Sequence, residues 1–290
     1  GHLGHLGHLA HCNRRHIAAR CQDRGRAIDD AMKAVVYREY GSADVLGVGK
    51  GRVLGIIPEV SEDPSNPEGF DLAIQRQPRS VIAESIRQIR TPLLKHVQSE
   101  NHKVVLVVPA SPMSGATSII GNLAASCAAL ELKVLIVDAN FRKPRVHAHF
   151  NLHESPGLAE ALAEQASFEQ CVQSTSVENL SILAAGSAEQ RIVERLGTQR
   201  FDRLVEQAKR SFDLVLVDVA PGIVSGDSQL VANHVDAAIL VARAMQDKRG
   251  LVARLAGLLQ DCKSDFLGVV VNGVRSSAGG YYRKNMQAMD

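Results

Sequence analysis

Residues 104–118 read VVLVVPASPMSGATS, an apolar run that opens into a turn of small residues. Phosphate-binding loops have this strand–turn–helix outline, written as G-x-x-x-x-G-K-[ST]. Aligned on that pattern, Ala110 stands at the first glycine, Gly115 at the second, Ala116 at the lysine and Thr117 at the hydroxyl residue. The stretch therefore indicates either a phosphate site without its cation or a strand–turn–helix of the same outline.

Two acidic residues follow apolar runs further along the chain. The run KVLIVD ends at Asp138, and FDLVLVD ends at Asp218. A single aspartate in such a place is more often a strand terminator or a helix cap. Two of them at one edge of a parallel sheet, beside a helix N-terminus, could hold Mg²⁺ against phosphates, with the Thr117 hydroxyl as a further ligand. The predicted metal ligands are Thr117, Asp138 and Asp218.

The elements that must position these residues follow an alternating pattern. Helical patterns separate short runs rich in Val, Ile and Leu, which are KVVLVV, KVLIVD, LSILAA, FDLVLVD, DAAILVA and FLGVVVN. Runs that are apolar on both faces indicate a parallel sheet covered by helices on both sides, with a ligand crevice at the carboxyl ends of the strands. We predict an α/β, three-layered, doubly wound fold with a mostly parallel central sheet.

The same patterns divide the chain. Residues 1–50 open with a threefold GHL repeat, have no core-forming period and are expected to be disordered. Residues 51–79 are rich in proline and turn formers and are expected to form a linker. The domain is expected to span 80–275 and to open with a helix capped by Ser80, and a tail follows at 276–290.

Composition excludes some classes of partner. A net charge of +2, 4% aromatic residues and no Trp argue against nucleic-acid binding. Five widely spaced cysteines without a C-x-x-C pair indicate reduced thiols in a cytoplasmic protein. No apolar stretch approaches the ~18 residues of a membrane helix. A membrane connection is therefore expected only through a partner.

Several segments occur in the order of one known family. They are ESIRQIRT, PASPMSGATS, VLIVDANFRKPRVHAHF, RFDRLVEQAKRSFDLVLVD and GVVVNGV. The chain thereby resembles the bacterial tyrosine kinases of exopolysaccharide and capsule synthesis, a MinD/ParA-like branch of the P-loop NTPases. The resemblance implies ATP or ADP with Mg²⁺ as cofactors, a homo-oligomer, and a membrane polysaccharide copolymerase as partner at the inner face of the membrane.

The resemblance also implies roles for individual residues. Asp138 and Asn140 occupy the D-x-D motif and Asp218 the Walker B position, which are the catalytic positions. Asn272 matches a position that contacts adenine in relatives. The implied nucleotide-binding residues are Ala110, Ser111, Met113, Ser114, Gly115, Ala116, Thr117, Ser118 and Asn272.

Two further groups carry over from the family. Glu84, Arg87 and Arg90 match an E-x-x-R-x-x-R helix that mediates subunit contact, although a solvated helix surface with i,i+3 pairs explains the same spacing. Tyr281 and Tyr282 stand where the family carries its phosphorylated tyrosines.

The chain departs from the family pattern at positions that take part in phosphate binding and catalysis in the family. Ala116 replaces the lysine that contacts the β- and γ-phosphates, Met113 replaces a loop glycine, and Asn140 replaces the second aspartate. Ser111 stands at the MinD/ParA signature lysine. The nearest lysines in sequence, at 103 and 133, lie at strand starts, on the edge opposite the phosphates.

Loss of such a cationic contact costs phosphoryl transfer a factor of ~10³–10⁵, or roughly 4–7 kcal/mol. We therefore expect a kinase-like protein that is catalytically impaired and acts as a scaffold or nucleotide-dependent regulator of the copolymerase. One alternative is an active tyrosine autokinase in which Lys284 or a neighbouring subunit supplies the cation. Another is a MinD/ParA-like positioning ATPase, against which the absence of both loop lysines argues.

Overall fold

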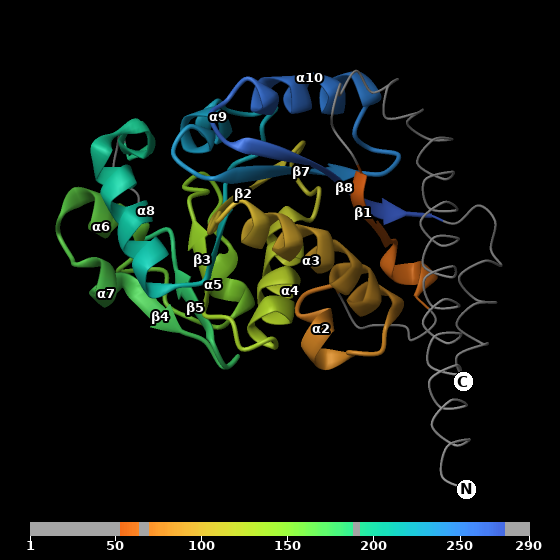
Figure 1. The fold of residues 1–290 in the computed structure, drawn as a ribbon, viewed down its shortest axis with the longest axis horizontal. Coiled ribbons are helices and arrows are strands. Elements are labelled where there is room, and N and C mark those ends of the chain that lie inside the picture. Colours follow the sequence, from red (N-terminus) through yellow and green to blue (C-terminus); the bar gives the residue numbers. More distant parts are fainter. Residues whose placement is uncertain (1–52, 64–69, 188–191, 276–290) are drawn as a thin grey trace, which may run out of the picture. The chain divides into compact units, whose positions relative to one another are not determined.

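The computed structural model describes residues 53–63, 70–187 and 192–275, which form one sheet and the helices around it (Figure 1). Residues 1–50 and the tail residues Tyr281, Tyr282 and Lys284 lie outside the described ranges. The strands are β1 (Val53–Pro58), β2 (Val104–Pro109), β3 (Val134–Asp138), β4 (Val172–Ser174), β5 (Leu180–Leu183), β6 (Leu214–Asp218), β7 (Ala237–Arg243) and β8 (Asp265–Val274). All six predicted strands are present, and β1 and β4 are additional.

The sheet has the order β1-β8-β7-β2-β6-β3-β5-β4. Only the β4–β5 pairing is antiparallel among the described strands. The α-helices are α2 (Ala73–Arg76), α3 (Val81–Ser99), α4 (Ala116–Ala128), α5 (Val146–His149), α6 (Leu158–Ala163), α7 (Phe168–Cys171), α8 (Gln199–Ser211), α9 (Asp227–Ala232) and α10 (Arg249–Gln260). Two 3-10 turns, Val60–Glu62 and Val193–Gly197, complete the described elements.

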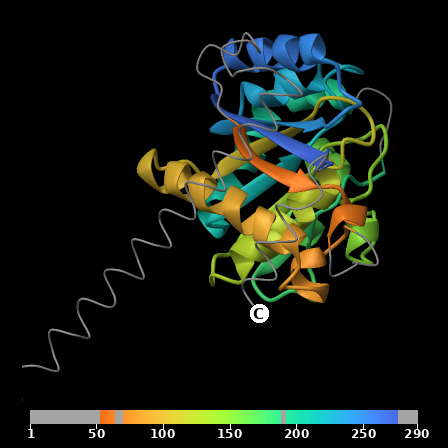
Figure 2. The same ribbon diagram turned by 90° about the vertical axis from the view of Figure 1, so that its right-hand side faces the viewer.

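Helices cover both faces of the sheet, as predicted (Figures 1 and 2). Helices α3 and α4 pack on one face, where they share a hydrophobic core with β2, β3, β6 and β7. Helices α8, α9 and α10 contact the strands from the other face. Every residue of β2, β3 and β6 is buried, as expected for central strands of a doubly covered parallel sheet. The predicted doubly wound α/β fold is confirmed.

Helix α3 begins as its sequence predicts. The Ser80 hydroxyl accepts a hydrogen bond from the Ala83 amide, which satisfies one of the free N–H groups of the first turn. The apolar stripe of α3, which is Ile82, Ile86, Ile89 and Leu93, is fully buried. In the described part of the chain, no helix combines the length and the apolar character needed to cross a membrane.

The prediction of a linker at 51–79 is wrong for much of that segment. Strand β1 pairs in parallel with β8, with Ile56 opposite Val271. Residues 70–76 pack on α4, where the Asn122 side chain accepts from the Ile74 amide (2.9 Å) and donates to the Phe70 carbonyl (2.7 Å). One side of an edge strand has no neighbouring strand, so proline, which lacks a backbone N–H, is tolerated there. The proline content of residues 51–79 therefore does not exclude a strand. The described fold therefore includes residues 53–63 and 70–79, and the predicted start at residue 80 lies inside it.

Candidate functional site

The loop between β2 and α4 has the backbone shape that its single glycine predicts. Gly115 precedes α4 with φ of +85°, a left-handed conformation that suits glycine. Met113 also has a left-handed φ, +66°, although it carries a side chain. That conformation costs an L-residue about 1–2 kcal/mol. The Met113 side chain is 85% exposed, so replacement of the family glycine strains the backbone and does not crowd the core.

Asn272, near the end of β8, holds the loop in place. Its Nδ2 atom donates a hydrogen bond of 2.8 Å to the carbonyl of Ser114. A Cβ atom at Gly115 would lie 2.3 Å from the same Nδ2, so a larger residue would displace the Asn272 side chain from the loop. The Ser114 hydroxyl is buried and has no hydrogen-bond partner among the described residues. The contact of Asn272 with adenine remains a prediction. The hydrogen bond between Asn272 and the loop is not predicted from the sequence.

The two aspartates meet at the carboxyl edge of the sheet. Asp138 and Asp218 are partners in the β3–β6 register, and their side chains are 0% and 1% exposed. Asp138 accepts hydrogen bonds from three backbone amides, those of Asn140 (3.0 Å), Arg145 (3.1 Å) and Val146 (3.1 Å). The carboxylates therefore lie side by side behind the loop.

Thr117 links the loop to this pair. Its hydroxyl donates a 2.7 Å hydrogen bond to Oδ2 of Asp218. The other oxygen, Oδ1, is buried and has no hydrogen-bond partner in the described chain. A buried acceptor without a partner is costly, and a bound cation satisfies it. The three predicted metal ligands are thus close together, and their oxygen atoms are the ligands that Mg²⁺ prefers.

Burial raises the pKa of both carboxyl groups. The pKa of Asp138 rises to about 6 because desolvation outweighs its three backbone hydrogen bonds. The pKa of Asp218 is raised well above its usual range, first by burial and then by the neighbouring charge of Asp138, against the hydrogen bond from Thr117. Two adjacent buried acids of this kind take up a proton or a cation at neutral pH.

No cation comes from the loop itself. Ala116, at the lysine position, is the first residue of α4 and is 4% exposed, so its methyl group lies in the fold. Residues 110–118 contain neither Lys nor Arg. The ammonium of Lys103, at the far end of β2, donates to the carbonyls of Lys209 (2.8 Å) and Phe212 (3.2 Å). As predicted, Lys103 lies at the opposite edge of the sheet and does not contact the loop.

A pocket of about 290 Å³ lies over the loop and has basic residues on one side. Arg142, Lys143 and Arg145 line it, and all three follow the strand that ends at Asp138. Arg142 lies 3.4 Å from Oδ2 of Asp227. The other residues that line the pocket are Pro109, Ser111, Pro112, Met113, Ser114, Gly115, Ala116, Thr117, Ser118, Asn140, His149, Pro221 and Val224.

Sequence reasoning missed these three cations. They lie neither within the loop nor at the neighbouring strand starts, where Lys103 and Lys133 stand. The segment NFRKPR follows Asp138 directly, so its place at the carboxyl edge could have been read from the same strand assignment.

Asn140 and Ser118 also line the pocket. The Asn140 side chain accepts a 3.3 Å hydrogen bond from the Lys143 amide, so it shapes the basic segment. The Ser118 hydroxyl donates to Asp71 Oδ1, and His149 lies 3.4 Å from that oxygen. Asp71 belongs to the segment predicted as a linker, which therefore reaches the loop.

The predicted subunit-contact residues split into two groups. Glu84 and Arg87 form a partly exposed ion pair of 3.1 Å, and Arg87 donates to the Pro78 carbonyl (2.5 Å). Arg90 turns inward and donates to the carbonyl (2.8 Å) and the hydroxyl (3.0 Å) of Ser126 in α4. Arg90 therefore joins two helices within one chain, while the role of Glu84 and Arg87 in oligomers remains a prediction.

A larger pocket, of about 460 Å³, lies between α6, α7 and α8. Its Arg200 and Arg203 each lie 3.6 Å from carboxylate oxygens of Glu164. None of the predicted site residues lines it, and the strand-end aspartates are elsewhere. The smaller pocket over the loop is therefore the candidate site.

Comparisons with known proteins agree with this geometry. The family model described as "Cellulose biosynthesis protein BcsQ" matches residues 112–261. Tyrosine-protein kinase YwqD of Bacillus subtilis (strain 168) is 32% identical over 209 residues, which cover 71% of this chain and 88% of that protein.

Solved structures show the same fold. The chimerical protein CapA2B2 superposes with a TM-score of 0.72 at 25% identity, covering 84% of this chain and 100% of that one. The septum site-determining protein MinD of Pyrococcus horikoshii, complexed with Mg-ADP, gives a TM-score of 0.52 at 19% identity, covering 61% of this chain and 75% of that one, which is a likeness of fold alone. With its P-loop fold, its paired strand-end aspartates and a relative of this similarity, the chain belongs to the family of bacterial tyrosine kinases.

Proposed function

We propose that this protein binds a Mg²⁺–nucleotide in the pocket over the 110–118 loop but transfers the γ-phosphate poorly. It then acts as a nucleotide-dependent or purely structural regulator of polysaccharide polymerisation and export. Its partner is a membrane polysaccharide copolymerase, which keeps it at the inner face of the membrane. The segment RVLGIIPEV, which resembles what precedes the kinase domain in forms fused to a copolymerase, supports that partner.

The position of Ala116 carries the proposal. A buried methyl group stands where the family has the lysine, while Thr117, Asp138 and Asp218 lie together at the carboxyl edge of the sheet, which supports a metal site there. Mg²⁺, when bound, would neutralise phosphate oxygens. Backbone N–H groups of the loop and the N-terminus of α4 would hold the phosphates. The groups that would bind the nucleotide are therefore largely present. The charge that would stabilise the transferring phosphoryl group is reduced.

Asn140 lowers the expected rate further. In the family motif a second carboxylate stands at this position, where it could accept the tyrosine proton. An amide cannot do so. Its observed bond to the Lys143 amide supports a structural role for the Asn140 side chain.

The second candidate is an active tyrosine autokinase, and the basic segment favours it. Arg142, Lys143 and Arg145 line the same pocket, so one of them could approach the γ-phosphate in place of the lysine. Guanidinium groups bind phosphate oxygens in pairs and stay charged at any physiological pH.

A lysine replacement separates the two candidates. The full chain is incubated with Mg²⁺ and γ-labelled ATP beside the double variant Ala116→Lys/Asn140→Asp, and phosphotyrosine is quantified. Gln165→Lys, at an exposed position away from the loop, is the control for a lysine added elsewhere on the protein. We expect the double variant to be about 10³-fold faster than the parent. Phosphotyrosine formation by the parent at the rate of an active double variant would establish the autokinase instead.

Nucleotide binding is measured separately with a fluorescent ADP analogue. Binding by the parent supports nucleotide-dependent regulation. Absence of binding at millimolar concentration would remove that part of the proposal and leave a scaffold.

A further inference from the structure

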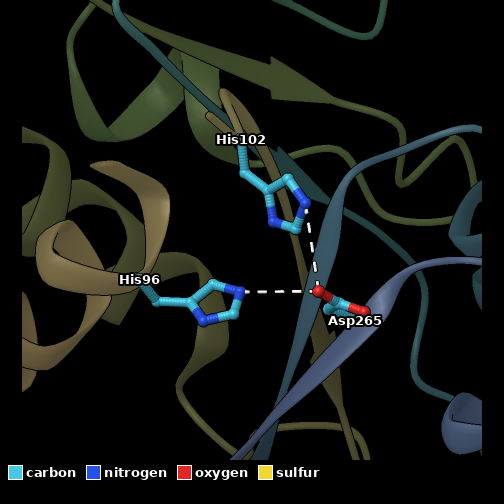
Figure 3. Close-up of side chains that lie close together, drawn as sticks. All are labelled: His96, His102 and Asp265. Atoms are coloured by element: carbon cyan, nitrogen blue, oxygen red, sulfur yellow. Dashed lines mark ion pairs between the residues drawn. The ribbon is translucent and has the colours of Figure 1, made fainter. Parts of the chain in front are cut away.

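Three side chains of types that can bind a metal lie close together (Figure 3). His96 lies in the last turn of α3, His102 lies between α3 and β2, and Asp265 is the first residue of β8. Since β2 and β8 run parallel through β7, their amino ends lie at one edge, far from the strand-end aspartates. The fold therefore brings together ligands from separate parts of the chain.

The distances in this cluster are not those of hydrogen bonds. Nε2 of His96 lies 3.7 Å and Nε2 of His102 lies 3.9 Å from Oδ2 of Asp265. Both exceed the usual N–H···O range. A tetrahedral ion with bonds of about 2.0–2.1 Å holds its ligand atoms roughly 3.3 Å apart, so small side-chain rotations would bring these atoms to that spacing. The three ligand atoms already lie within 4.8 Å of one another.

One imidazole nitrogen that faces Asp265 also has no hydrogen-bond partner. Nε2 of His96 is buried and is without a partner in the described residues. An ion pair with Asp265 would not satisfy a buried imidazole nitrogen. The Asp265 carboxylate lies beyond hydrogen-bond distance, and because it is 59% exposed, water screens its charge. A buried polar atom without a partner indicates that something else satisfies it.

We propose that His96, His102 and Asp265 bind one zinc ion. Two imidazoles and one carboxylate suit Zn²⁺ and other borderline transition metals, whereas Mg²⁺ prefers oxygen ligands alone. The exposed side of Asp265 leaves room for water as a fourth ligand. The ion would fasten the end of α3 to the start of β8 and so stabilise the fold, independently of the nucleotide site.

The test is zinc binding by the full chain after removal of metals with EDTA. ZnCl₂ is titrated by calorimetry, and the unfolding temperature is measured with and without it. His96→Asn and Asp265→Asn should each bind one equivalent fewer than the parent, or bind that equivalent at least tenfold more weakly. Both should also lose the zinc-dependent rise in Tm. Asp265→Asn changes an exposed side chain, so it keeps the test valid if His96→Asn does not fold.

The histidine-rich N-terminal segment can bind zinc as well, with His2, His5, His8 and His11. Every variant keeps that segment, so the difference from the parent reports the cluster alone. His153→Asn, an exposed histidine elsewhere in the fold, is the matched control and should behave as the parent. Equal zinc stoichiometry and equal Tm rise in the parent and both cluster variants would overturn the proposal. A parent whose Tm does not respond to zinc would also overturn it.

Discussion

The hydroxyl of Thr117 donates a 2.7 Å hydrogen bond to Oδ2 of Asp218, which joins the first turn of α4 to the end of β6. This bond fixes one carboxylate oxygen and leaves the other buried without a partner among the described residues. The pair is thus arranged to accept a cation, and burial of an unpaired carboxylate oxygen costs folding free energy. Both the binding of a cation and the stability of the fold can be measured.

Asp218→Asn should stabilise the metal-free protein and abolish Mg²⁺-dependent nucleotide binding. The amide oxygen can still accept from Thr117, while the buried charge beside Asp138 is removed. We expect the Tm in EDTA to rise by a few degrees, since 1 kcal/mol corresponds to about 2–4 °C at this size. Calorimetry with Mg²⁺ and ADP provides the second readout. Asp261→Asn, at an exposed carboxylate, should change neither.

The raised pKa of Asp138 predicts the direction of a pH effect on stability. Its folded pKa of about 6 exceeds the ordinary value near 4, so between those values the folded state binds more protons than the unfolded state. The contribution of Asp138 to stability is therefore fully present below pH 4 and is lost as the pH rises through 6. Its size is about 3 kcal/mol, at 1.36 kcal/mol per pKa unit.

The measurement is denaturant unfolding in EDTA at pH 4 and pH 7 for the parent and Asp138→Asn. The variant loses hydrogen bonds at both pH values but has no proton to release. The difference in unfolding free energy between the parent and the variant should therefore fall by about 2 kcal/mol from pH 4 to pH 7, because the unfolded carboxyl is only partly protonated at pH 4. A constant difference would show that Asp138 does not titrate in this range.

Gly115→Ala should destabilise the loop. The added Cβ would lie 2.3 Å from Nδ2 of Asn272, and the φ of +85° disfavours any side chain. We expect a loss of about 2 kcal/mol or more in unfolding free energy. Gly226→Ala is the control, because a Cβ added there would have nothing within 4 Å and the φ of Gly226 is −80°. A loss at Gly226 equal to that at Gly115 would argue against this cause.

Substitutions along α3 distinguish subunit contact from folding. Arg90→Ala removes two hydrogen bonds to Ser126 and should cost about 1–3 kcal/mol of stability. Glu84→Ala removes only a partly exposed pair, for which we expect less than about 1 kcal/mol, whereas Arg87→Ala also removes the bond to the Pro78 carbonyl. If Glu84 and Arg87 mediate assembly, both variants should shift the mass measured by light scattering towards the monomer, and Glu84→Ala should keep the parent Tm.

The sequence predicted the central strands because each is a short apolar run between helix-length segments. It predicted Asp138 and Asp218 as neighbours because parallel strands end at one edge. It could not show that Arg90 turns towards Ser126, since that contact depends on how α3 and α4 pack. Strand β1 was missed because its six residues lie in a segment rich in proline, and its place at the sheet edge depends on a β8 far along the chain.

The basic segment after β3 gives the last prediction. Lys143→Ala and Arg145→Ala each remove a positive charge from the pocket over the loop, so each should weaken Mg·ADP binding by about tenfold or less. Lys95→Ala removes the same charge from the exposed surface of α3 and should leave binding unchanged. If these residues hold phosphates only, the affinity falls while the slow phosphorylation of the parent keeps its rate at saturating ATP. If one replaces the missing lysine, that rate falls as well, because the cation would then act on the transferring group.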